Sequence, residues 1–173
     1  MKILAGFPAR NVFALGVVAV ALSACASADV SAIKRVDQNT INSVKVTEVN
    51  VTVETPKPHP QLKAALAEEL SKSVPACSKG EKPYVMNVAV VDFEEQDVAK
   101  SIFLGDEIEL SGRVELVDVA TGEQIGEYFV DRSFFWGGFV GAAMMSDAER
   151  SLSEGFAESV CEEVFGVAPE KES

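Results

Sequence analysis

The most constraining feature of this sequence is a strict alternation of apolar and charged or polar residues at positions 107–117. One side of such a stretch is apolar and the other is polar, which is the pattern of a half-buried β-strand. The segment DVATGEQ follows at 118–124, with Gly122 suited to a left-handed turn position, and an aromatic and β-branched run covers 125–134. These residues predict an antiparallel hairpin.

Two more strands are predicted upstream of the hairpin. Residues 44–53 are rich in valine and threonine, but the apolar phase slips, and a bulge near Thr47 and Glu48 would reconcile it. Residues 84–93 are apolar on both faces, which suits a central strand.

Apolar residues at helical spacing predict two helices. The first covers 61–74 and is expected to end at Pro75. The second opens at Ser146, which begins a capping box with Glu149, and runs to Phe165.

The predicted order is β-α-β-β-β-α, which favours an α+β fold. A right-handed crossover makes strands 44–53 and 84–93 parallel, and both helices then lie on one face of a mixed four-stranded sheet. The simplest architecture is a two-layer sandwich over residues 43–166, followed by a disordered tail at 167–173.

Charge and composition exclude several functional classes. The chain has 173 residues, with 27 acidic and 15 basic ones and a formal net charge of -12. Phosphate binding needs a basic surface, so nucleic acid is excluded as a partner. Because the sequence has one histidine and three cysteines, most metal sites and histidine-dependent catalytic arrangements are not available. We therefore expect no enzyme activity, no metal and no cofactor.

A mean hydropathy of +0.15 is high for so acidic a chain, and the N-terminus accounts for much of it. Lys2 and Arg10 precede an uncharged run at 12–22. Ser23, Ala24 and Cys25 follow this run. A basic start, a short apolar stretch and small residues predict a signal peptide over residues 1–24. The run is too short to span a bilayer. Its removal leaves 27 acidic and 13 basic residues, a formal charge of about -14.

Leu22, Ser23, Ala24 and Cys25 resemble the bacterial lipobox. The resemblance implies cleavage before Cys25, which would then carry fatty acyl chains such as palmitate. The alternative is that Cys25 is an incidental residue of an ordinary signal peptide. The absence of aspartate after Cys25 resembles Gram-negative lipoproteins of the outer membrane and implies a periplasm-facing, lipid-anchored protein. Residues 25–42 are then the acylated cysteine and a flexible tether.

Cys77 and Cys161 are expected near neighbouring helix ends, where an oxidising periplasm favours a disulfide. Two buried free thiols are the alternative.

The segment 134–145, FFWGGFVGAAMM, is uncharged and contains the only tryptophan. It either covers an open end of the core or contacts a partner or a membrane, because exposed apolar surface usually marks an interaction site. The candidate interaction residues are Phe134, Phe135, Trp136, Phe139, Met144 and Met145.

Two polar features of the sequence are not expected to form a catalytic or a metal site. His59 lies between two prolines and is expected to be a loop residue without a catalytic role. A group of carboxylates surrounds the connection between the second and third strands, and its spacing fits a solvated acidic loop better than a cation site. Its members are Asp92, Glu94, Glu95, Asp97, Asp106 and Glu107.

The hairpin DVATGEQIGEY, with the helix that follows, resembles small bacterial lipoproteins, including those of curli secretion and envelope transporters. This resemblance implies a fold and an envelope location over roughly residues 87–165 and does not identify an activity.

The leading hypothesis is a non-catalytic, lipid-anchored envelope domain that binds or scaffolds an envelope protein partner. Its candidate surfaces are the 134–145 segment and an unpaired sheet edge, either 44–53 or 107–117. The alternative is a periplasmic carrier of a lipid or another hydrophobic small ligand, with the same segment at the mouth of its pocket.

Overall fold

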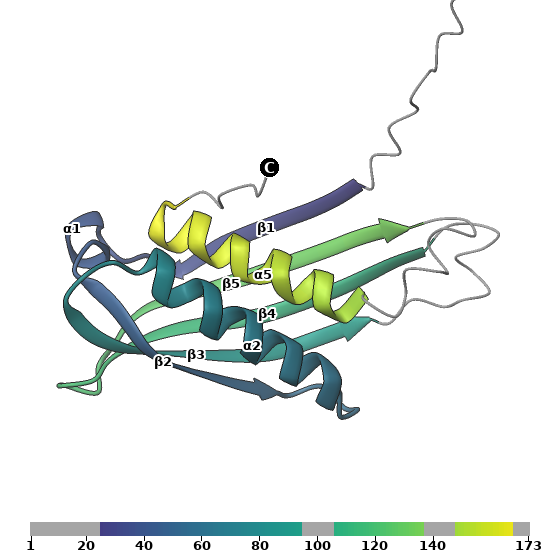
Figure 1. The fold of residues 1–173 in the computed structure, drawn as a ribbon, viewed down its shortest axis with the longest axis horizontal. Helices are drawn as coiled ribbons and strands as arrows, with labels where there is room; N and C mark the ends of the chain where they lie inside the picture. The colour runs from purple at the N-terminus through teal and green to yellow at the C-terminus, as the bar shows by residue number, and fades with distance from the viewer. Residues whose placement is uncertain (1–24, 95–105, 137–147, 168–173) are drawn as a thin grey trace, which may run out of the picture.

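The computed structural model describes residues 25–94, 106–136 and 148–167. These residues form one sheet with two long helices packed on one of its faces (Figure 1). The elements in chain order are β1 (Cys25–Lys34), α1 (Gln38–Ile41), β2 (Val44–Val53), α2 (Pro60–Cys77), β3 (Lys82–Glu94), β4 (Asp106–Asp118), β5 (Gln124–Trp136) and α5 (Ala148–Phe165).

The expected α+β class with both long helices on one face is confirmed, but the expected number of strands is wrong. The sheet has five strands in the order β1-β5-β4-β3-β2. β2 and β3 are parallel, as the crossover rule predicts, and the other neighbours are antiparallel. Of the two candidate edges, 44–53 is confirmed, because β2 is an edge strand among the described residues, and 107–117 is not, because β4 pairs with β3 on one side and β5 on the other. The edges are β1 and β2.

Residues 25–34, expected to belong to a flexible tether, form the edge strand β1. Their backbone pairs antiparallel with β5. The chain then turns into the short helix α1, whose first N–H groups donate to the Asp37 carboxylate at 3.1 and 3.0 Å. Ile41 of α1 is buried in the core. A polar, aperiodic segment is therefore ordered because β5 offers it an unpaired edge.

The predicted bulge in β2 is confirmed. The register between β2 and β3 shifts between Val46 and Glu48. Val44 and Val46 before the bulge and Val51 after it are all buried, so the extra residue returns the apolar phase to the helix-covered face.

Helix α2 continues past Pro75 and ends at Cys77, so the expected stop at Pro75 was wrong. A proline removes one N–H donor, and here that loss falls in the last turn. The Ser78 N–H donates to the Val74 carbonyl at 2.9 Å and closes the helix. The core side of α2 consists of residues that are fully buried: Leu62, Leu66, Leu70 and Val74.

Helix α5 packs against the sheet through Phe156, which has no exposed surface. A Cβ atom added to Gly112 of β4 would lie 2.8 Å from Cζ of Phe156. The glycine therefore makes room for the ring, and the closeness of the two residues identifies the face of β4 that α5 covers.

The predicted disulfide joins the end of α2 to α5. Cys77 and Cys161 are bonded, with a Cα–Cα distance of 5.6 Å, and both are buried. The covalent bond thus lies within the helical layer and fixes the two helices to each other.

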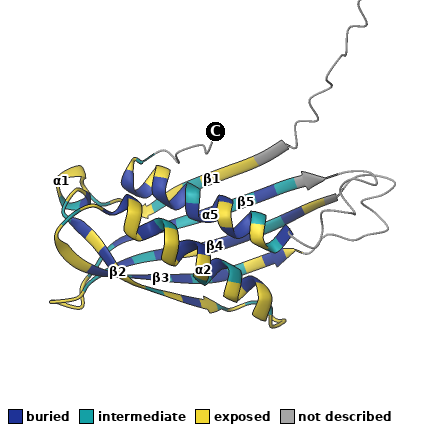
Figure 2. Ribbon diagram, in the orientation of Figure 1, coloured by how far each residue is buried: buried dark blue, intermediate teal, exposed yellow. Residues whose placement is uncertain are grey.

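The face of the sheet opposite α2 and α5 is covered by no helix among the described residues, and we call it the open face. Buried residues alternate with more exposed ones along the strands (Figure 2). The side chains of the open face are polar or charged over much of β1, β5 and β4.

Candidate functional site

The lipidation candidate lies beside the beginning of the apolar segment. Cys25 is the first residue of β1, and its backbone partner in β5 is Phe135. Trp136 pairs with Asp106 at the start of β4. The described end of β1 and the end of β5 thus meet at one end of the sheet (Figure 1), although the sequence separates them by most of the domain.

The apolar segment begins inside a strand. The second strand of the hairpin was expected to end at 134, but β5 continues to Trp136. Phe134 is partly buried against the core, and its ring centroid lies 5.1 Å from the Arg132 guanidinium carbon. This position fits the interpretation in which Phe134 covers the core. For Phe135 and Trp136 the structure describes the backbone, and Phe139, Met144 and Met145 lie outside the described residues.

A surface groove of about 390 Å³ lies on the open face near this end of the sheet. Its lining comes from the first part of β1 and from facing parts of β4 and β5: Ser27, Ala28, Asp29, Glu109, Asp131 and Ser133. The hydroxyls of Ser27 and Ser133 are 2.7 Å apart and bridge β1 to β5. The groove is therefore polar and mostly acidic.

The acids of the groove continue as a row across four strands. Asp29 of β1 is directly opposite Asp131 of β5, which is opposite Ser111 of β4, which is opposite Asp92 of β3. Two residues along the strands, Glu109 is opposite Glu94. Like charges directly opposite each other destabilise strand pairing.

Burial and mutual repulsion change the acidity of two of these groups. The pKa of Asp131 is raised, first by desolvation and then by the charges of Asp29, Glu107 and Asp92, although a hydrogen bond with Ser111 opposes the rise. The pKa of Glu109 is raised by desolvation and then by Asp131 and the neighbouring carboxylates. No described lysine or arginine forms an ion pair with Asp29, Glu109 or Asp131.

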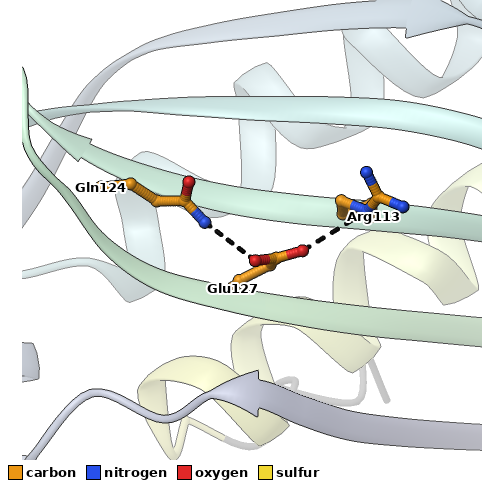
Figure 3. Close-up of polar contacts among 3 residues, drawn as sticks. All are labelled: Arg113, Gln124 and Glu127. Carbon is orange, nitrogen blue, oxygen red and sulfur yellow. Dashed lines mark hydrogen bonds and ion pairs between the residues drawn. The ribbon is translucent and has the colours of Figure 1, made fainter.

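Toward the other end of the open face, Glu127 has polar and basic partners, although Glu115 of β4 lies directly opposite it. The Glu127 carboxylate lies 3.5 Å from Nε of Arg113 and accepts a hydrogen bond from Nε2 of Gln124 at 3.0 Å (Figure 3). The groove carboxylates Asp29, Glu109 and Asp131 have no such basic partner among the described residues. Such a surface can accept hydrogen bonds and attract positively charged groups.

The structure redistributes the acidic residues that the sequence placed in one solvated loop. Asp92, Glu94 and Glu107 belong to strands β3 and β4, while Glu95 and Asp97 lie outside the described residues, and only the backbone of Asp106 is described. Sequence reasoning missed three acids that complete the cluster: Asp29, Glu109 and Asp131. The polar phase of 107–117 contained Glu109, but only the strand register reveals the other two.

His59 precedes α2, and its ring contacts Phe93 edge-on at a centroid distance of 4.8 Å. The described residues contain no group of three or more histidine, cysteine or carboxylate side chains arranged to hold a metal ion. Within the same residues, no helix is both long and apolar enough to cross a membrane.

The chain matches no protein-family model and no curated protein. Several solved structures are remotely similar to it. The PelC dodecamer from Paraburkholderia phytofirmans is 14% identical, with 76% of this chain and 95% of that chain covered and a TM-score of 0.46. A presumed lipoprotein from Caulobacter crescentus is also 14% identical, with coverages of 75% and 92% and a TM-score of 0.45.

A DUF330 protein from Xanthomonas campestris is 12% identical, with coverages of 69% and 83% and a TM-score of 0.37. Similarity this remote leaves the function to be argued from the residues of this chain.

Proposed function

We propose that this chain is a lipid-anchored, non-catalytic domain of the bacterial cell envelope that binds or scaffolds another envelope component. The observation that carries the proposal is the pairing of Cys25 with Phe135 across β1 and β5. Two features that the sequence singled out for separate reasons, an acylation motif and an aromatic segment, meet at one end of one sheet.

This arrangement suits contact with a membrane. An acyl group on Cys25 would bring the adjoining end of β5 to the lipid surface, and tryptophan and other aromatic residues are favoured at membrane–water interfaces. The negative charge of the domain repels anionic headgroups, so the acyl chains would supply the attachment. The disulfide between Cys77 and Cys161 fits the oxidising periplasm, and we place the protein at the outer membrane, facing the periplasm.

Two surfaces of the domain suit an envelope protein partner. β2 has one unpaired edge, where an extended segment could add as another strand. The acidic groove on the open face favours a partner that carries basic side chains there, because complementary charge directs association.

No described feature favours a carrier of hydrophobic ligands. Pockets that hold such ligands are lined mainly by apolar side chains, whereas the groove is lined largely by serine, aspartate and glutamate. The scaffolding function is therefore the one we propose.

The anchor is tested by mass spectrometry and membrane fractionation of the wild-type chain and of Cys25→Ser. We expect an acylated N-terminal cysteine and membrane association that Cys25→Ser abolishes. Ser31→Ala, an exposed position on the same strand, is the matched control and should stay on the membrane. An unmodified wild-type chain in the soluble fraction would contradict the proposal.

The partner is tested by capture from detergent-solubilised membranes with the wild type and a Trp136→Ser, Phe139→Ser double variant. Retained urea stability with lost capture of a specific partner would support a contact function of the aromatic segment. Lost stability would contradict it and would assign the segment to the core. A Glu109→Lys variant separately tests the groove, where reversal of charge should weaken a basic partner.

A further inference from the structure

Strand β1 is held to the domain by few side-chain contacts. None of its described side chains is buried, and Ile33 is 59% exposed. Its neighbour β5 contributes Tyr128 and Val130 to the core, with exposures of 4% and 0%. Val30 and Ala32 are partly buried against the core, and the rest of the attachment of β1 comes from the backbone ladder and the serine bridge to β5.

The ladder between β1 and β5 contains a pair of like charges. Asp29 and Asp131 are direct partners, and carboxylates from the elements packed beside them add to the repulsion: Glu107 and Glu109 from β4, and Asp92 and Glu94 from β3. The nearest basic side chains are engaged elsewhere. Arg113 pairs with Glu127, and Arg132 lies on the helix-covered face, where its Nη1 donates to Ser159 at 3.5 Å.

The chain immediately after β1 is, by contrast, firmly packed. A Cβ atom added to Gly126 would lie 2.5 Å from Cγ2 of Val36, so Val36 fills the space above that glycine. The Val36 N–H donates to the Tyr128 hydroxyl at 3.3 Å, and Ile41 is buried beyond it. Any separation of β1 from the sheet would thus stop at Val36.

We infer that β1 is a pH-sensitive strap, which pairs more firmly with β5 when Asp131 and Glu109 are protonated and separates more readily, as far as Val36, when they ionise. The direction follows from linkage. Asp131 and Glu109 have raised pKa values in the paired state, first because they are desolvated there, so the paired state binds more protons than the released one. Pairing is therefore strengthened as the pH falls through these raised values and weakened above them.

Release would change the distance between the domain and its anchor. The ten residues of β1, if freed and fully extended, span at most about 33–36 Å. This consequence rests on the proposed acylation of Cys25, whereas the release itself does not. With the strap paired, the domain would lie close to the membrane. With the strap released, the domain could move farther from the membrane.

Hydrogen–deuterium exchange on the full chain in detergent micelles tests the strap. Amide protection is measured from pH 8.0 down to the ordinary pKa range of carboxylates, at about pH 4, and corrected for the intrinsic exchange rate. We expect the amide protection of β1 to fall about two- to fivefold as the pH rises. A cross-strand charge repulsion changes the equilibrium between the paired and the separated strand by about this factor. β3 should not change. Protection in β1 that is independent of pH, or that is lost only together with β3, would overturn the inference.

Variants identify the responsible groups. Asp29→Asn, at an exposed position, and Asp131→Asn should each raise β1 protection at pH 8.0 and flatten its pH dependence. Glu48→Gln removes the same charge from β2, on the opposite edge of the sheet, and should leave the dependence intact. If Glu48→Gln changed the pH dependence of β1 protection as much as Asp29→Asn does, the inference would be overturned, because the net charge of the domain would then explain the effect. Cys25→Ser should behave as the wild type, which separates failure of the strap from failure of the anchor.

Discussion

Opening the bond between Cys77 and Cys161 should destabilise the domain more than most substitutions in its core. The two residues are separated by 84 positions, and the bond restricts the unfolded chain by closing the loop between them. The chain-entropy relation for a loop of this size gives about 4.6 kcal/mol at 25 °C. That is a large part of the roughly 5–15 kcal/mol that stabilises a typical domain.

Urea denaturation followed by circular dichroism measures the effect. The oxidised wild type, the reduced wild type and a Cys77→Ala, Cys161→Ala double variant should be compared under the same conditions. Reduction removes the cross-link but keeps both sulfur atoms in the core, whereas the alanine variant also removes their packing. We expect the alanine variant to be the least stable of the three. Without the cross-link the unfolded chain also exposes more surface, so the dependence of the unfolding free energy on urea should steepen.

The reasoning would be refuted by an oxidised and a reduced protein with the same urea midpoint. It would also be refuted if the alanine variant were destabilised while reduction had no effect, because the contribution would then come from packing alone. Free thiols of Cys77 and Cys161 detected in the unreduced protein would show that the bond does not form.

Three further predictions concern single positions. Leu66→Ala should lower the unfolding free energy by about 2–5 kcal/mol in urea titration, because Leu66 is fully buried, whereas Ile33→Ala, at 59% exposure, should change it by less than about 0.5 kcal/mol. Gly112→Val should cost about 1–3 kcal/mol in the same assay, because a Cβ there would lie 2.8 Å from Phe156, and an unchanged midpoint would contradict the packing described. Asp118→Ala should shift the urea midpoint down at neutral pH. This loss should vanish as the pH falls below the pKa of Asp118, which hydrogen bonds from Ala120 and Thr121 hold below the ordinary value.

The hairpin was the most predictable part of the fold. Its alternation and turn residues are local, and β4, the left-handed Gly122 at φ 69° and β5 all appear where the pattern indicates. The Asp118 carboxylate accepts hydrogen bonds from the N–H groups of Ala120 and Thr121 at 2.8 and 3.1 Å, which adds a local reason for the turn.

β1 was not predictable by the same rules. Its sequence, CASADVSAIK, contains small and polar residues with little alternation, so its local preference for a strand is weak. The strand exists because β5 presents an edge that pairs with it, and that edge comes from residues far along the chain. Local pattern carries no information about such an interaction.

The acidic groove was missed for a related reason. Glu109 was visible as part of an alternating strand, but Asp29 and Asp131 become partners only through the register of β1 on β5. A shift of one residue would send each side chain to the other face. The disulfide was easier to predict because the sequence has three cysteines, and the assignment of Cys25 to the lipobox left one pairing.

The position of β1 in the sheet also determines when the fold can be completed. Ser27 of β1 and Ser133 of β5 are partners although 106 positions separate them in the sequence. β1 is therefore synthesised long before β5, the strand with which it pairs. During synthesis, β2, α2 and β3 can associate while β1 still has no neighbour. The sheet is therefore completed only after β5 has formed, and until then the backbone of β1 has no strand to pair with.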